Sequence, residues 1–171
     1  MMRSTPTTRA GLHRTTALLA CICFVLAAVP PTAADVVEVP NLGRIEFPNS
    51  GSDEAQEPFI RGVLLLHNFE YGDAREAFVE AQEIDPDFAL AYWGEAMTHN
   101  HPLWREIDQE AAREALAKLA PTHEERLAKT PTDRERGYLE ALQHLLGEGD
   151  KSERDAAYSA AMGDLSARYP N

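Results

Sequence analysis

Apolar side chains recur at helical spacing from residue 55 onward, whereas the residues before them show no such period. Apolar positions three and four residues apart share one face of a helix, and this pattern predicts helices at 55–69 and 73–84. Pro86 ends the second helix because proline has no amide hydrogen to donate. The positions that carry the two faces are Phe59, Val63 and Leu66, then Ala74, Phe78 and Ala81.

Further helices follow, and the residues at their starts predict where they begin. Asp108 precedes one apolar period, and Thr122 and Thr132 are each followed three residues later by a glutamate. In that pattern a hydroxyl and a carboxylate satisfy the free amides of the first turn. Asp150 and Glu153 repeat the spacing before the last helix. The predicted helices lie at about 87–100, 108–119, 123–129, 132–146 and 151–169, so the predicted fold class is all-α.

Residues 35–54 differ in composition from the helical region. Proline and glycine recur through them at short intervals, which indicates an extended lead-in with turns. We expect one short strand within it, at Arg44–Phe47. The residues that interrupt the segment are Pro40, Gly43, Pro48 and Gly51.

The helical region matches itself at a shift of 34 residues. Phe59 then falls on Trp93 and Gly62 on Ala96, so aromatic meets aromatic and small meets small. Helices joined by short turns lie antiparallel, and a 34-residue period of such hairpins is that of the tetratricopeptide repeat. The remaining coincidences are Ala55 with Ala89, Val63 with Met97 and His67 with His101.

The first unit also carries the internal spacings of that repeat, in Gly62, Ala74-x-x-x-Phe78, Ala81 and Pro86. The chain therefore resembles the tetratricopeptide-repeat family over roughly residues 43–171. More narrowly, the segments FIRGVLLLHNFEYGDAREAF, PDFALAYWGEAM and NHPLW are similar to a group of exported bacterial repeat proteins of uncharacterised activity.

The resemblance implies antiparallel hairpins stacked as an α-solenoid, with units at about 55–88, 89–121 and 132–170. The second unit departs from the pattern, since Ala96 and Ala112 are sixteen residues apart where Gly62 and Ala74 are twelve apart. In such a stack each hairpin buries its apolar face against its neighbour. The residues implied in this packing are Gly62, Ala74, Phe78, Ala81, Pro86 and Ala96.

In this family the first helix of each hairpin lines a concave groove, so the resemblance implies a groove that binds a peptide or protein segment. Apolar anchors supply the affinity of such a groove and polar groups set the register. The alternative, that Trp93 and Met97 belong to the core, stays open. The implied groove residues are Phe59, Val63, Leu66, His67, Leu90, Trp93, Met97, Asn100 and His101.

The first 34 residues predict a secretory signal peptide. Three arginines and no acid precede the apolar run TALLACICFVLAAV, and small residues lead up to Ala34, which fits cleavage after that residue. The run is shorter than the ~20 residues of a membrane span. We therefore expect an exported protein, periplasmic or secreted, without stable membrane insertion; an uncleaved membrane anchor is the alternative.

Removal of this leader changes the composition. Both cysteines, Cys21 and Cys23, lie in it, so the mature chain would have neither disulfides nor thiol chemistry. Three of the 16 basic residues also leave, against 28 acidic residues that stay, and the net charge moves from −12 to −15. Such an acidic chain disfavours nucleic acid and anionic lipid as partners.

Histidines are the candidates for metal chemistry. His99 and His101 would point about 200° apart on a helix, at ~100° per residue, whereas the repeat places His67 beside His101. Two imidazoles make an incomplete zinc site, so neither a metal nor a cofactor is predicted. The sequence contains neither GxSxG nor HExxH, the motifs of serine hydrolases and zinc proteases.

We therefore expect a non-catalytic exported repeat scaffold that binds a peptide or protein segment. One alternative is a metal-dependent enzyme or metal-binding protein that uses His67, His99 and His101. Another is that the chain is the N-terminal part of a longer repeat protein whose activity lies downstream. Neither the identity of the partner nor the oligomeric state follows from the sequence.

Overall fold

Helices joined by short connections make up most of the folded unit. The computed structural model describes Met1 and residues 37–170, so the predicted signal peptide otherwise lies outside the described residues. Seven α-helices occur in residues 37–170, and the all-α prediction is confirmed. They are α1 (Asp53–His67), α2 (Tyr71–Ile84), α3 (Ala89–Met97), α4 (Gln109–Leu119), α5 (His123–Ala128), α6 (Asp133–Leu145) and α7 (Lys151–Arg168).

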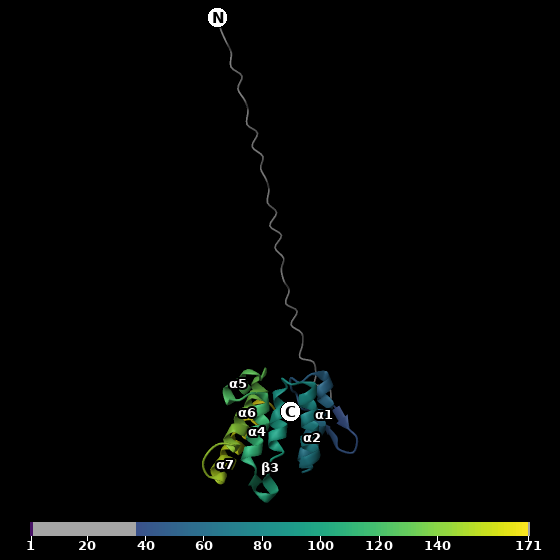
Figure 1. Cartoon of the computed structure of the whole chain (residues 1–171), viewed down its shortest axis with the longest axis vertical. Helices are drawn as coiled ribbons and strands as arrows, with labels where there is room; N and C mark the ends of the chain where they lie inside the picture. The colour runs from purple at the N-terminus through teal and green to yellow at the C-terminus, as the bar shows by residue number, and fades with distance from the viewer. Residues whose placement is uncertain (2–36, 171) are drawn as a thin grey trace. The chain divides into compact units, whose positions relative to one another are not determined.

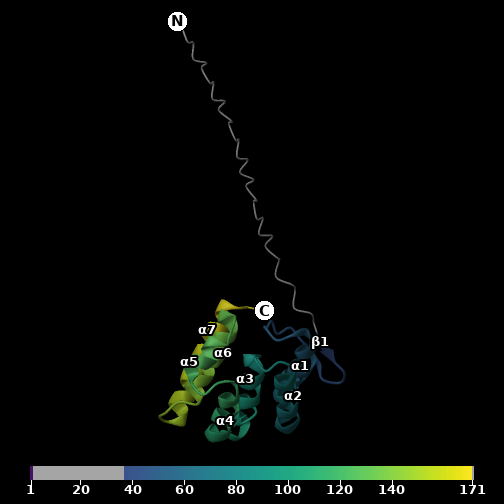
Figure 2. The ribbon, with the colours of Figure 1, turned by 45° about the horizontal axis from the view of Figure 1, so that its top comes forward.

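The helices form three pairs, α1 with α2, α3 with α4 and α6 with α7, which lie side by side in Figure 2. Helix α3 is the centre of this arrangement because it also contacts α1, α2 and α6. The short α5 precedes α6 and packs against it. Among the described helices, none combines the length and the apolar character that crossing a bilayer requires.

Two small antiparallel hairpins accompany the helices. In the lead-in, β1 (Val37–Val39) pairs with β2 (Gly43–Ile45), close to the predicted strand. The second hairpin joins β3 (Asn100–His101) to β4 (Glu106–Ile107) through the 3-10 turn η1 (Pro102–Trp104). It lies at the end of the unit opposite α5 (Figure 1).

The predicted helix at 87–100 is therefore too long, because α3 ends at Met97. Beyond it the Thr98 hydroxyl donates a hydrogen bond of 2.7 Å to the Glu95 carbonyl. The backbone N–H of Asp108 then donates to the carbonyl of His99, at 3.0 Å. The carbonyls of Glu95 and His99 and the amide of Asp108 therefore have hydrogen-bond partners that a continuing helix would not give them. A strand pair follows α3 instead of another helical turn.

Phe78 fills the junction between the first two helical pairs. Its side chain is fully buried, and it packs against two glycines on neighbouring helices. A Cβ added to Gly62 on α1 would lie 2.8 Å from the Phe78 ring, and one added to Gly94 on α3 would lie 2.3 Å from it. The backbones of α1 and α3 can therefore approach the ring only because both positions lack a side chain. Ala55, Ala74, Ala81 and Ala96 are buried in the same core.

Most of the predicted helix starts carry the expected caps. The Asp108 carboxylate accepts a hydrogen bond of 3.0 Å from the N–H of Ala111, and Thr122 forms a reciprocal capping box with Glu125. Thr132 caps α6 by accepting from the N–H of Glu135, at 3.2 Å. Helix α7 begins at the predicted residue, but its predicted side-chain cap is wrong, since the Asp150 side chain makes no capping hydrogen bond.

The lead-in packs against the last helical pair. Ser50 donates its backbone N–H to the buried carboxylate of Glu135 on α6, at 2.7 Å. The guanidinium of Arg134 donates to the Pro48 carbonyl at 2.8 Å and lies over the Phe47 ring, 5.2 Å from its centroid. These contacts fix Phe47 beside α6, where it forms one wall of the cavity described below.

Candidate functional site

A cavity of about 330 Å³ lies where the first three helices meet α6, α7 and the lead-in. Its size is near the lower end of the range for small-ligand sites, roughly 300–1,000 Å³. The walls come from segments far apart in the sequence, so the cavity exists only in the folded unit. The residues that line it are Phe47, Leu66, His67, Phe69, Tyr71, Trp93, Met97, Asn100, Pro102, Tyr138, Tyr158 and Met162.

Three aromatic rings pack against one another as one wall of this cavity. The centroids of Trp93 and Tyr138 are 5.1 Å apart in an edge-to-face arrangement. The Phe47 ring lies 5.3 Å from Tyr138 and 6.3 Å from Trp93. Rings at these separations gain energy beyond their burial, so the wall holds its position without a ligand.

Two polar atoms of the lining have no hydrogen-bond partner within residues 37–170. They are the indole Nε1 of Trp93 and the hydroxyl oxygen of Tyr71, and both atoms are buried. The Trp93 side chain as a whole is only 5% exposed. A buried polar group without a partner costs roughly 1–3 kcal/mol, so these two atoms destabilise the packing around the cavity.

The ring of His67, one of the lining residues, is held by a hydrogen bond within α1. Its Nδ1 lies 2.7 Å from the backbone carbonyl oxygen of Val63. Because a carbonyl oxygen only accepts, Nδ1 carries the proton of this bond. In the neutral ring Nε2 is then the acceptor.

Helix α7 contributes Tyr158 and Met162 to the cavity. The Tyr158 hydroxyl makes a weak hydrogen bond to the sulfur of Met97, at 3.9 Å. Burial, with a smaller contribution from Tyr138, raises the pKa of Tyr158 to about 12. The described residues that line the cavity include no Asp, Glu, Lys or Arg, so the lining is neutral while His67 is neutral.

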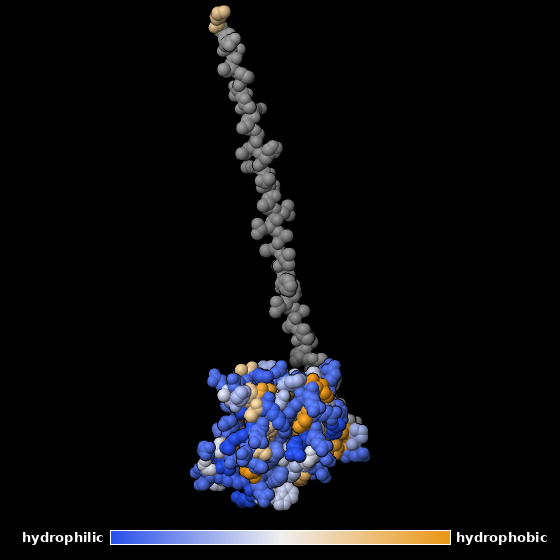
Figure 3. Space-filling model, in the orientation of Figure 1, coloured by the Kyte–Doolittle hydropathy of each residue, from blue (hydrophilic) through white to orange (hydrophobic). Residues whose placement is uncertain are grey.

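An exposed apolar rim borders the cavity. We use this name for Phe69, Leu103 and Trp104, which are 46%, 64% and 60% exposed. The Tyr71 ring connects the rim to the cavity, since its centroid lies 6.4 Å from the rings of both Phe69 and Trp104. The face shown in Figure 3 is mostly hydrophilic with separate apolar patches.

The structure separates eight of the nine predicted groove residues into two groups, and His101 is described below. Leu66, His67, Trp93, Met97 and Asn100 line the cavity. Three others were wrongly predicted to line the groove. They are at most 1% exposed and fill the core between the helices. These three are Phe59, Val63 and Leu90.

His101 does not join His67 in the cavity. Its ring packs on Tyr71, with centroids 4.2 Å apart, and it lines a separate depression together with His99. Burial, and next the charge of Arg75, lower the pKa of His99.

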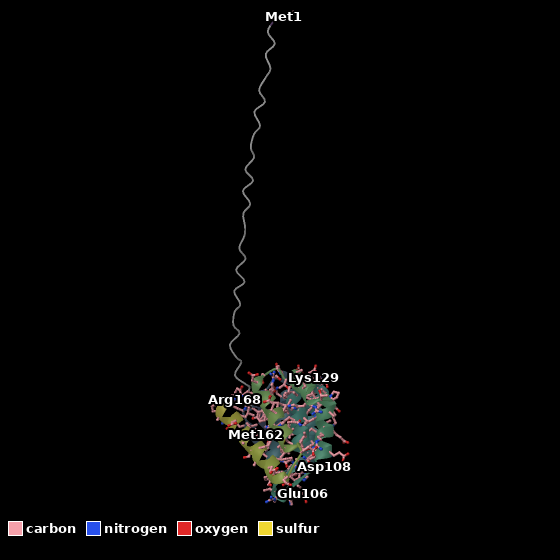
Figure 4. All side chains as sticks on the ribbon, turned by 90° about the vertical axis from the view of Figure 1, so that its left-hand side faces the viewer. Met1, Glu106, Asp108, Lys129, Met162 and Arg168 are labelled. Carbon is pink, nitrogen blue, oxygen red and sulfur yellow. The ribbon has the colours of Figure 1, made fainter. Side chains whose placement is uncertain are left out.

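Two acids, Glu106 and Asp108, also line this depression, and Figure 4 places them at the end of the unit opposite Lys129. Within the described part of the chain, however, no group of three or more His, Cys, Asp or Glu side chains is placed to hold a metal ion. The alternative that uses His67, His99 and His101 therefore gains no supporting geometry.

Several lining residues were missed by the sequence analysis, and all but Tyr138 come from outside the first helices of the hairpins. Tyr158 and Met162 lie four residues apart on one face of α7, a spacing that could have indicated a shared surface. Phe47 is the single aromatic residue of the lead-in, which was a signal for burial. The other missed residues are Phe69, Tyr71, Pro102 and Tyr138.

Comparison of the chain with protein-family models, with curated proteins and with solved structures finds no match.

Proposed function

We propose that this protein is a non-catalytic, exported scaffold of tetratricopeptide-like hairpins that binds a peptide or protein segment. The bound segment inserts one side chain into the aromatic cavity. The observation that carries the proposal is the cavity itself, with its aromatic wall, beside an exposed apolar rim. Enclosed pockets that receive an anchor side chain supply most of the affinity of peptide-binding surfaces.

The arrangement of the helical pairs supports the repeat part of the proposal. Three pairs follow one another, and α3, the first helix of the second pair, contacts both α1 and α6, the first helices of its neighbours. Phe78 packs between Gly62 and Gly94 at the first junction. A stack in which each hairpin covers the next buries its apolar faces in this way. The insertion of α5 and of the β3–η1–β4 hairpin is a departure from a regular array.

The exposed apolar rim is evidence for a macromolecular partner. Leu103 and Trp104 are more than half exposed at the tip of the β3–η1–β4 hairpin. Exposed apolar side chains gathered beside a cavity are typical of surfaces that bind another molecule. A segment lying across the rim would bury these side chains and at the same time place an anchor in the cavity.

Panning of a random-peptide display library against the purified full chain tests the proposal. We expect enriched peptides that share an apolar or aromatic anchor. Their affinity should fall at least tenfold with Trp104→Asp, which alters the rim. Ile84→Asp is the matched control, since Ile84 is 42% exposed and lies at the other end of α2 from Tyr71.

Two results would refute the binding proposal: no enriched sequence, or enriched peptides that bind the Trp104→Asp and Ile84→Asp variants equally well. Export is supported separately by the leader pattern of residues 1–34. Its test is the N-terminal sequence of the chain recovered from the periplasm or medium, expected to begin at Asp35.

A further inference from the structure

We propose that the segment bound by this protein is basic, with a lysine or arginine beside the apolar anchor, and that this cation pairs with Glu106 and Asp108. The inference rests on the proposed function and names the chemistry of the partner. It follows from the place of these two acids next to the exposed apolar rim, from their exposure and from the charges around them.

The cavity and an acidic depression share a wall. We use the second name for the surface lined by His99, His101, Glu106, Ile107, Asp108 and Gln109. Tyr71 lines the cavity and His101 lines the depression, and the centroids of their rings are 4.2 Å apart. Trp104 of the rim lies near both rings, 6.4 Å from Tyr71 and 6.3 Å from His101. A segment that crosses the rim can therefore contact the cavity and the depression together.

The two acids of the depression are accessible and unpaired. The side chains of Glu106 and Asp108 are exposed, and both lie at the hairpin end of the unit in Figure 4. Within residues 37–170 neither of them forms an ion pair. One oxygen of Asp108 accepts from the amide of Ala111, at 3.0 Å. A cation on a bound segment can thus reach both carboxylates without a rearrangement of the fold.

The charge around the rim is negative. Residues 66–75 and 98–108 carry the rim and the shared wall, and they contain four acids and two arginines. The acids are Glu70, Asp73, Glu106 and Asp108, and the arginines are Arg75 and Arg105. The residues that line the depression, all of them described, include no Lys or Arg. Burial, and next the charge of Arg75, lower the pKa of His99, so this imidazole is neutral at pH 7 and does not offset the acids.

These charges disfavour the other occupants of the rim. An acidic segment would bring like charges together, and so would a second copy of this chain, whose net charge is −12. Like charges placed opposite one another suppress a wrong partner, whereas opposite charges speed the encounter with the right one. An uncharged segment would cover the rim but gain nothing from the depression. A basic segment is the occupant that uses both surfaces.

The shared wall also sets the spacing between anchor and cation. In an extended segment, residues two apart lie on the same side and are separated by roughly 7 Å. The rings of Tyr71 and His101 separate the cavity from the depression. The long flexible stem of a lysine adds further reach. We therefore expect the cation two residues from the anchor.

Association rates of labelled peptides with the full chain test the inference. The probe is the most enriched peptide from the display library, synthesised with lysine, norleucine or glutamate two residues from its anchor. The lysine form should associate about threefold faster than the norleucine form and roughly tenfold faster than the glutamate form at low salt. These differences should shrink at high salt, because ions screen exposed charges.

A double variant assigns the effect to the depression. Glu106→Gln combined with Asp108→Asn removes both charges, and asparagine retains the N-cap of α4 because it is as good a cap as aspartate. Glu83→Gln combined with Glu124→Gln is the matched control. It changes the net charge equally at two exposed residues, one in the last turn of α2 and one in α5. Only the first double variant should lose the preference for the lysine peptide.

Equal association of the three peptides would overturn the inference and leave the proposed function standing, and so would identical behaviour of the two double variants. A chain dimer in sedimentation that Trp104→Asp dissociates would assign the rim to a second copy and overturn the inference as well. Absence of any enriched peptide would remove the proposed function itself, and the basic partner with it.

Discussion

The carboxylate of Glu135 accepts a hydrogen bond of 2.7 Å from the backbone N–H of Ser50, a residue 85 positions earlier in the chain. Its second oxygen accepts from the hydroxyl of Thr132, at 2.8 Å. The side chain is only 1% exposed. One carboxylate therefore helps to begin α6 and fastens the lead-in to it.

Glu135→Ala should lower the free energy of unfolding by about 3 kcal/mol, because it leaves the Ser50 amide and the Thr132 hydroxyl without their charged partner. Glu125→Ala is the control. Glu125 holds the same capping position in α5, but it is exposed and bonds only to Thr122. Urea denaturation should show a much smaller loss for Glu125→Ala. Similar losses in the two variants would show that the contact with Ser50 contributes nothing.

Gly94→Ala should destabilise the fold by about 1–3 kcal/mol, the usual cost of overpacking a core. The added Cβ would lie 2.3 Å from the buried Phe78 ring. Gly163→Ala in α7 is the matched change, since nothing lies within 4 Å of its added Cβ. There, alanine should stabilise the helix by roughly 0.5–1 kcal/mol. Chemical denaturation should therefore show a lower free energy of unfolding for Gly94→Ala and a higher one for Gly163→Ala. A stabilised Gly94→Ala variant would contradict the packing described at this junction.

Asp108→Ala should cost about 1 kcal/mol, the typical value for loss of an N-cap, because the carboxylate accepts from the Ala111 amide. Asp150→Ala should have little effect, since that side chain makes no capping bond. Both residues directly precede a helix, so the pair isolates the hydrogen bond. Equal decreases in the stability of the two variants, measured by thermal unfolding, would argue against a cap at Asp108.

Alkaline pH should weaken the fold through Tyr158. Burial raises the pKa of this phenol from 10.0 to about 12, so the folded state binds a proton that the unfolded state releases first. The corresponding stability, roughly 2–3 kcal/mol, is fully present below pH 10 and is lost as pH rises toward 12. Tyr158→Phe should flatten the unfolding free energy between pH 9.5 and 11.5; an unchanged slope would contradict the assignment.

Local rules predicted the helices well. The spacing of apolar residues and the caps at Asp108, Thr122 and Thr132 depend on neighbours within one or two turns, so the sequence carries them directly. The predicted end of α3 was wrong because the hydrogen bonds donated by Thr98 and Asp108 compete with the backbone bonds that would continue the helix. A pattern of apolar positions contains no information on that competition.

The cavity could be predicted only in part. Trp93 and Met97 were expected in a groove from the 34-residue shift, and both line the cavity, although Trp93 also belongs to the buried core. Tyr138, Tyr158 and Met162 approach them through the packing of α6 and α7, a distance relation that no local pattern expresses. Leu90 and Phe59 were misplaced because the face that lines the groove and the face that fills the core overlap on these helices.

Phe47 links the three helical pairs to one another. Its ring lies 5.5 Å from Phe59 on α1, 6.3 Å from Trp93 on α3 and 5.3 Å from Tyr138 on α6. In a repeat array whose units contact only their neighbours, the ends can fray while the middle persists. Here one aromatic side chain from the lead-in couples all three pairs, so the unit should melt in a single cooperative step. The lead-in can take its final position only after α6 has formed.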